Sequence, residues 1–109
     1  MKRTAFYLRY GKPIHFEKVK GYTESFPIEG YGLFTVCYWY DKHKRIWNSI
    51  DPGTGLKLTY AKTLPDCQVK TYDVSDAILK CIRDKWYKDY VSDLEQWLET
   101  NEKITPLPF

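Results

Sequence analysis

The sequence predicts an α+β fold, in which an antiparallel sheet of four to six strands precedes a carboxy-terminal helical segment packed on one face. Apolar and polar residues alternate with a period of two over much of residues 3–60, which is typical of half-buried strands. From Asp73 onward the apolar residues recur at intervals of three and four, which is typical of a helix. No linker, internal repeat or low-complexity tract divides the chain, so residues 1–109 are expected to form a single domain.

The amino-terminal third predicts one hairpin followed by a less regular stretch. Strand Arg3–Tyr10 is expected to return through a Gly-Lys-Pro turn into strand Ile14–Val19. The segment Gly21–Gly32 contains Pro27, which cannot donate to a neighbouring strand. We therefore expect an edge strand or an ordered loop there.

The middle of the chain predicts a three-stranded meander. Strand Leu33–Tyr40 turns through Asp41–Lys44 into an antiparallel strand, Arg45–Ile50. The sequence DPGTG, Asp51–Gly55, has the proline and glycines of a tight turn. Strand Leu56–Tyr60 then completes the meander.

The carboxy-terminal part predicts helical structure. The segment Ala61–Tyr72 is expected to be a connection, with a short strand at Gln68–Tyr72 as an alternative. Asp73 or Ser75 would then cap the helix at its amino end.

The length of this helical segment leaves two alternatives open. One helix could run to Leu98, or a break near Val91 could divide it into two, because Ser92–Glu95 is a capping-box pattern. The last residues, Ile104–Phe109, contain two prolines and predict an extended tail.

Strand Leu33–Tyr40 is apolar on both faces, which has two explanations. In the first, a helix at residues 74–98 covers one face, the amino-terminal hairpin covers the other, and both faces are core. In the second, aromatic residues remain exposed beside a basic turn and form a binding patch, either Phe34, Tyr38 and Tyr40 or Trp39 with Trp47. The candidate binding residues of this patch are Tyr38, Tyr40, Lys42, Lys44, Arg45 and Trp47.

Composition narrows the classes of protein. Aromatic residues make up 17% of the chain, which is enough to supply both a core and a binding surface. Residues 1–72 carry a net charge of +6 and residues 73–109 a net charge of −3, a division that can orient a charged partner.

No apolar run is long enough for a signal peptide or a membrane span, so we expect a cytoplasmic protein without membrane contact. Three scattered cysteines, Cys37, Cys67 and Cys81, predict free thiols.

No catalytic, metal or cofactor site is predicted. The two histidines, His15 and His43, have no neighbouring nucleophile or orienting group in the sequence, and Cys67 lies in a separate segment. Histidines and cysteines show no metal-ligand spacing. The paired glycines at Gly30 and Gly32 lack the rest of a phosphate-binding motif. The sequence thus favours a protein that is not an enzyme and that holds no cofactor.

One stretch resembles a known pattern. Trp47 leads into the turn Asp51-x-x-Thr54-Gly55, followed by a strand and then a helix. Residues 33–82 in this order are similar to small β-β-β-α proteins of phages and mobile elements. The resemblance implies a setting in which non-enzymatic inhibitors of bacterial defence systems, including anti-CRISPR proteins, are common.

These observations leave two hypotheses for function. The first is a non-catalytic protein-binding module that inhibits a host nucleic-acid-processing complex of the CRISPR type, so that the partner is a host protein or ribonucleoprotein. The alternative is a protein that binds RNA or single-stranded DNA through the same aromatic and basic face. A homo-oligomer is a further alternative, because surplus apolar surface can be buried against a second copy.

Overall fold

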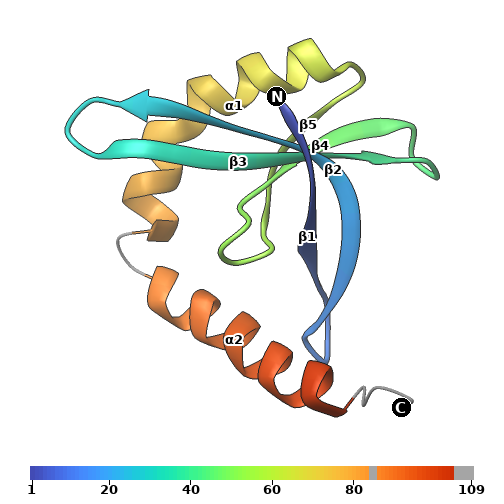
Figure 1. The fold of residues 1–109 in the computed structure, drawn as a ribbon. Coiled ribbons are helices and arrows are strands. Elements are labelled where there is room, and N and C mark those ends of the chain that lie inside the picture. The colour runs from blue at the N-terminus through green and yellow to red at the C-terminus, as the bar shows by residue number, and fades with distance from the viewer. Residues whose placement is uncertain (84–85, 105–109) are drawn as a thin grey trace.

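The computed structural model describes residues 1–83 and 86–104, and within them a five-stranded antiparallel sheet combines with two α-helices. The strands lie in the sheet in chain order: β1 (Lys2–Tyr10), β2 (His15–Ile28), β3 (Gly32–Asp41), β4 (Ile46–Ile50) and β5 (Lys57–Ala61). The helices are α1 (Leu64–Ile78) and α2 (Tyr87–Ile104), and a π-helical turn, η1 (Leu79–Arg83), follows α1. The predicted α+β class is confirmed (Figure 1).

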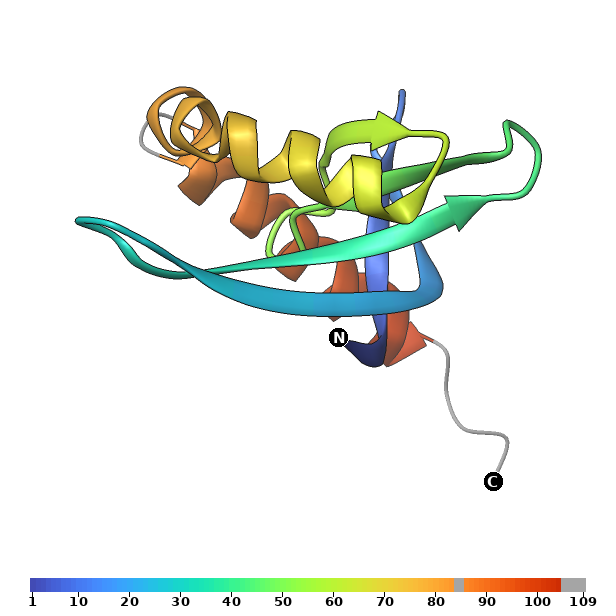
Figure 2. The ribbon, with the colours of Figure 1, turned by 90° about the horizontal axis from the view of Figure 1, so that it is seen from above.

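Strand β2 is longer than predicted and joins two parts of the sheet that run in different directions (Figures 1 and 2). Its first half pairs with β1 and its second half with β3, and Tyr22 has a partner on each side, Arg3 and Tyr38. A Cβ atom at Gly21 would lie 2.0 Å from the carbonyl oxygen of Tyr38. Only glycine allows the two backbones to approach this closely at the change of direction.

The segment predicted as an edge strand or a loop is the second half of this long strand. β1 pairs with β2 only as far as Thr23, so beyond that residue β2 has a neighbour on one side alone. Pro27 lies in this one-sided part of the strand. A proline is tolerated there because an edge strand does not need hydrogen bonds on both sides. The edge-strand alternative is therefore correct for the part of β2 beyond Thr23, although β2 as a whole lies between β1 and β3.

Both faces of β3 are covered over most of its length. Phe34, Val36 and Tyr38 pack beneath α1 in a cluster that includes Cys67 and Ile78. The opposite face contributes Cys37 to a second cluster, whose other members are Phe6, Leu8, Val19 and Ile50. The first explanation for the two-sided apolar strand is thus correct for its centre, although the covering helix is α1 and not residues 74–98. Cys37 and Cys67 are buried free thiols, and the side chain of Cys81 lies outside the described part.

Helix α1 begins earlier than predicted. Thr63 is its N-cap, and the Thr63 hydroxyl accepts a hydrogen bond of 3.3 Å from the N–H of Asp66. Pro65 stands in the first turn, where a helix needs no N–H donor, so the proline marks a helix start and not a connection. Residues Gln68–Tyr72 lie inside α1, so the expected short strand is wrong, as is the expected cap at Asp73 or Ser75.

The division into two helices is confirmed, but the break lies elsewhere. The chain leaves η1 at Arg83 and α2 begins at Tyr87, whereas Val91 and Ser92 lie within α2. Ile104 ends α2 and so is not part of an extended tail; the rest of that prediction, residues 105–109, lies outside the described residues.

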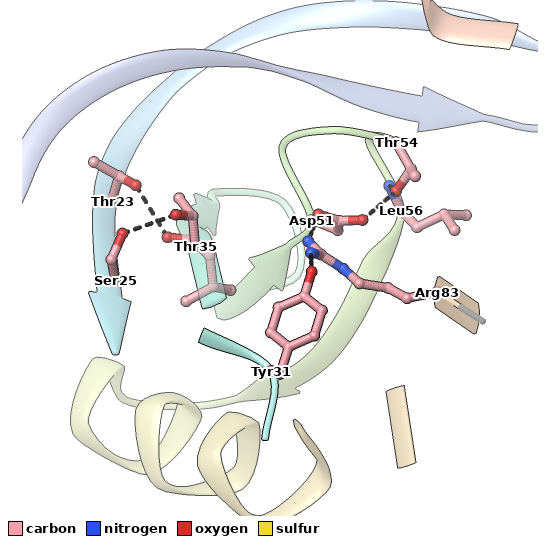
Figure 3. Close-up of polar contacts among 9 residues, drawn as sticks. Thr23, Ser25, Tyr31, Thr35, Asp51, Thr54, Leu56 and Arg83 are labelled. Carbon is pink, nitrogen blue, oxygen red and sulfur yellow. Dashed lines mark hydrogen bonds and ion pairs between the residues drawn. The ribbon is translucent and has the colours of Figure 1, made fainter. Parts of the chain in front are cut away.

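An ion pair connects the turn between β4 and β5 to the helices. The Arg83 Nη2 atom lies 2.7 Å from Asp51 Oδ1, and these side chains are 11% and 1% exposed. Arg83 Nη1 donates to the Tyr31 hydroxyl at 2.5 Å, so the tip between β2 and β3 joins the same cluster (Figure 3). The guanidinium also lies 4.7 Å from the ring centres of Phe34 and Tyr87.

The Asp-x-x-Thr-Gly turn owes its sequence to this cluster. The second carboxylate oxygen of Asp51 accepts a hydrogen bond of 3.0 Å from the Thr54 hydroxyl. The Asp51 carbonyl accepts the N–H of Gly55 at 2.7 Å, and Gly55 has a φ of +76°. A side chain at Gly55 would also crowd the backbone of β1, with Tyr7 O and Arg9 N 3.0 Å from the added Cβ. The residues that carry the mobile-element resemblance therefore have a structural role here.

Helix α2 packs on the β1–β2 hairpin (Figure 1). The Trp97 ring lies 6.0 Å from the ring of Tyr7 and 5.6 Å from that of Phe16. Arg9 Nη2 lies 2.9 Å from Asp93 Oδ2. Because Asp93 is 40% exposed, this second ion pair contributes less than the buried one.

We expect Arg83→Met to lower the free energy of unfolding by about 3–5 kcal/mol, because Met keeps the buried stem but leaves Asp51 as an unpaired buried charge. Urea unfolding followed by circular dichroism measures the change. Lys80→Met, at an exposed position of the same η1 turn, is the control and should change stability by less than about 0.5 kcal/mol. Equal stability of the two variants would contradict the proposed role of the ion pair.

Candidate functional site

The six residues predicted to bind a partner do not form one patch. Tyr38 is fully buried beneath α1, so its ring belongs to the core. Tyr40 and Trp47 are direct cross-strand partners, with ring centres 5.4 Å apart, and Trp47 also lies 6.2 Å from the ring of Tyr22. The three basic residues are exposed in the turn between β3 and β4: Lys42, Lys44 and Arg45.

Asp41 organises this basic turn. Its Oδ1 atom accepts the backbone N–H groups of His43 at 2.9 Å and Lys44 at 3.2 Å. The N–H of Arg45 donates to the Asp41 carbonyl at 2.7 Å, and Arg45 adopts a φ of +56°. These hydrogen bonds, that of Lys44 above all, hold the pKa of Asp41 below its ordinary value. The carboxylate is thus occupied by its own turn, and the lysine side chains extend from a fixed backbone.

A different set of residues meets on the face of the sheet opposite α1. Trp39 in β3 pairs directly with Asn48 in β4, and Asn48 pairs directly with Tyr60 in β5. Direct antiparallel partners point to the same face, so these three residues form one row across three strands. Tyr60 is 61% exposed, Trp39 is half-buried, and Asn48 is only 5% exposed.

Lysines flank this aromatic row. Lys57 Nζ lies 5.9 Å from the ring centre of Trp39 and 5.7 Å from that of Tyr10. Lys70 Nζ, from α1, lies 5.3 Å from the ring centre of Tyr60 and donates to the Tyr60 carbonyl at 3.0 Å. Cations and aromatic rings therefore alternate along this side of the molecule.

Three adjoining hollows run past the row, and we call them together the basic groove. The first, about 490 Å³, lies between Trp39 and the basic turn. The second, about 570 Å³, shares Lys44 and Lys57 with the first and includes Asn48 in its lining. The third, about 560 Å³, continues past Tyr60 to α1.

The lining of the basic groove carries excess positive charge. Five lysines contribute to it: Lys42, Lys44, Lys57, Lys62 and Lys70. Three carboxylates oppose them, Glu17, Asp41 and Asp66, and that of Asp41 is already occupied. The groove is suited to a ligand that presents negative charges and flat apolar rings.

Three important residues of this groove were absent from the sequence prediction, Asn48, Lys57 and Tyr60, whereas Trp39 belonged to one of its two alternatives. Alternation within β3 places Tyr40 on the face of Tyr38, beneath α1, and Trp39 on the opposite face. Tyr40 nevertheless lines the first hollow with Lys42 and Lys44, so three of the six predicted residues lie at the groove. The period-two pattern separates Trp39 from Tyr40 within β3. To predict that Asn48 lies beside Trp39, one also needs the length of the β3–β4 turn, which sets the register of the hairpin.

Comparisons with protein-family models, curated proteins and solved structures gave no match to this chain. In the described part of the chain, no helix has both the length and the apolar composition that crossing a bilayer requires. The resemblance of residues 33–82 to small mobile-element proteins stays a prediction, and function is inferred from the groove itself.

A second polar cluster lies between the sheet and α1. Glu24 accepts hydrogen bonds from the hydroxyls of Tyr38 at 2.5 Å and Tyr72 at 2.7 Å, and from Gln68 Nε2 at 3.3 Å. Burial, reinforced by Glu24, raises the pKa of Tyr72 to about 12 and that of Tyr38 further. These three donors come from β3 and α1, so the cluster joins the sheet to the helix.

Replacing Glu24 with Gln should lower the pKa values of Tyr38 and Tyr72, because the negative charge that opposes their ionisation is removed. Absorbance at 295 nm during alkaline titration measures this change. Since the folded pKa values exceed the unfolded one, the stability contributed by these hydroxyls is complete below about pH 10. It is lost as the pH rises through the folded pKa values, that of Tyr72 at about 12 and that of Tyr38 higher. Glu29→Gln, in the exposed turn after β2, is the control and should leave the titration unchanged.

Proposed function

We propose that this protein is a non-catalytic binding module whose ligand is single-stranded nucleic acid, held in the basic groove. The row Trp39–Asn48–Tyr60, flanked by Lys44 and Lys57, is the observation that carries the proposal. It is the alternative hypothesis of the sequence, with Asn48 and Tyr60 beside Trp39 in place of Tyr38 and Trp47.

The chemistry of a single strand fits this groove. Unpaired bases expose their flat faces, and stacking of a base on an aromatic side chain contributes about 1–3 kcal/mol. Tyr60 offers an exposed ring, and Lys44 and Lys57 stand beside it where a sugar-phosphate backbone would pass. In a duplex the base faces are stacked on one another and cannot reach these rings.

One observation also favours the first hypothesis, a host protein or ribonucleoprotein as partner. The third hollow is lined by apolar residues as well as lysines, and Val69 on α1 is 55% exposed within it. A ribonucleoprotein would present a strand to the basic part of the groove and protein surface to this end. Inhibition of a host complex of the CRISPR type is the form of this proposal that the mobile-element resemblance suggests.

Affinity for labelled oligothymidylate should fall steeply with salt. Four phosphate contacts would give a slope of about −3 for log affinity against log salt concentration. In the double variant Lys44→Gln/Lys57→Gln this slope should become less negative by about 1.4, because two contacts are lost. Fluorescence anisotropy between about 50 and about 200 mM NaCl measures both slopes.

The matched control is Lys80→Gln/Lys88→Gln, which removes the same charge from exposed positions on η1 and α2. Its slope should equal that of the unmodified protein. Equal slopes in the two double variants, or no binding at the lowest salt, would exclude the groove as a nucleic-acid site.

A protein partner is tested separately with Val69→Glu. This change places a charge in the apolar end of the groove and should abolish a protein contact there, since a buried unpaired charge is costly. The measurement is recovery of a nuclease-resistant partner by affinity capture from bacterial lysate. Val74→Glu, at a less exposed position of α1, is the control. If the same partner is recovered with both variants, the contact does not lie in the third hollow.

A further inference from the structure

The floor of the second hollow contains a hydrogen-bond donor without a partner. Asn48 is 5% exposed, and its Nδ2 atom is buried with no acceptor within hydrogen-bonding distance. The residue lies in β4, between β3 and β5, and it lines the hollow between Lys44 and Tyr60. Buried side-chain donors are nearly always paired in folded proteins, so this one needs an explanation.

An amide is a costly side chain at this position, because its Nδ2 donor is buried without a partner. Asparagine is disfavoured in strands, and an apolar side chain of the same size would avoid the cost of a buried unpaired donor. The neighbouring residues of the row, Trp39 and Tyr60, offer rings. Among the described residues, two other buried donors lack a partner, Arg9 Nη1 and Arg83 Nε, but both guanidinium groups are held in ion pairs, and of the three residues Asn48 is the one that lines the basic groove.

We propose that Asn48 is the reading residue of a nucleobase subsite: a base stacks on Tyr60, the Asn48 amide turns toward the hollow, and an acceptor atom on the edge of that base receives the Nδ2 hydrogen. This rotation is needed because Nδ2 is covered in the structure. This inference rests on the proposed function and names the part of the nucleic acid that enters the second hollow. The backbone positions of Trp39 and Tyr60 are separated by two strand spacings, roughly 10 Å, with Asn48 between them. A flat ring stacked on Tyr60 can extend over the amide.

A base fits this position better than a phosphate does. Asn48 is neutral and lies on the floor between aromatic residues, whereas the charged groups Lys44 and Lys57 are the ones suited to phosphates. A phosphate in contact with Asn48 would lose its hydration without gaining a positive charge beside it, which costs free energy. A base loses little by leaving water and gains a stacking face and a hydrogen bond.

The test uses two probes with the same phosphates: oligothymidylate and an abasic oligonucleotide of equal length. Asn48→Leu should weaken binding of oligothymidylate by about 3- to 10-fold, the value of one hydrogen bond, and leave binding of the abasic strand unchanged. The same variant should be at least as stable as the unmodified protein, because an unpaired buried donor has been removed. A purely structural role for Asn48 would give the opposite stability result.

A second measurement does not depend on the variant. The chain contains two asparagines, Asn48 and Asn101, so the side-chain amide of Asn48 can be assigned in a ¹⁵N–¹H spectrum. That signal should shift when oligothymidylate is added and should stay in place with the abasic strand.

The outcomes separate this inference from the proposed function. Failure of both probes to bind contradicts the nucleic-acid function itself. Equal losses for the two probes in Asn48→Leu, or an Asn48 signal that shifts with both, would make Asn48 a phosphate contact and overturn the base subsite. If Asn48→Leu binds both probes as tightly as the unmodified protein does, the basic groove is still a nucleic-acid site but Asn48 is not part of it.

Discussion

The buried ion pair between Arg83 and Asp51 is the interaction on which the arrangement of the elements depends. It joins the β4–β5 turn to η1, and through Tyr31 and Tyr87 it adds the β2–β3 tip and the start of α2. A charge as buried as that of Asp51 is stable only with such a partner, because its removal from water is otherwise uncompensated. The helical segment therefore has one position relative to the sheet, and α1 is held over the face formed by Phe34 and Val36.

The change of direction at Gly21 decides which parts of the sheet stay uncovered. The β1–β2 hairpin reaches across to Cys37 and Ile50 and closes the face opposite α1 at that level. Two pairs further along β3 and β4, Trp39 packs against the edge of this cluster and is only half-buried, and the basic groove begins there. The candidate site is thus the part of the sheet face where the covering hairpin ends.

The groove combines features that contribute little to folding. Asn48 keeps an unpaired donor in a strand, Tyr60 exposes most of its ring, and Lys44 extends into solvent. The core, in contrast, pairs Asp51, Tyr38 and Glu24 with hydrogen-bonding partners from this chain. In the part of the chain that the structure describes, two other buried donors lack a partner, Arg9 Nη1 and Arg83 Nε, but both belong to side chains held in ion pairs, whereas Asn48 lines a hollow. An unpaired donor beside a hollow is a feature expected of a binding surface.

Much of this architecture could be derived from the sequence. Alternation of period two located β1, β3, β4, β5 and the first part of β2, because this pattern depends only on local backbone geometry. For the second half of β2 the sequence allows either an edge strand or a loop. Helix α1 was located incorrectly, since Pro65 is compatible with either a connection or a first helical turn.

Tertiary structure alone decided which aromatic residues are core and which are exposed. The sequence could not place Tyr38 beneath α1, because the same alternation allows either face of β3 to be open. Nor could it bring Trp39, Asn48 and Tyr60 into one row, because strand register depends on turn geometry and on packing between distant segments. The sequence by itself determined the fold class and the supply of aromatic and basic side chains, and long-range pairing determined where they meet.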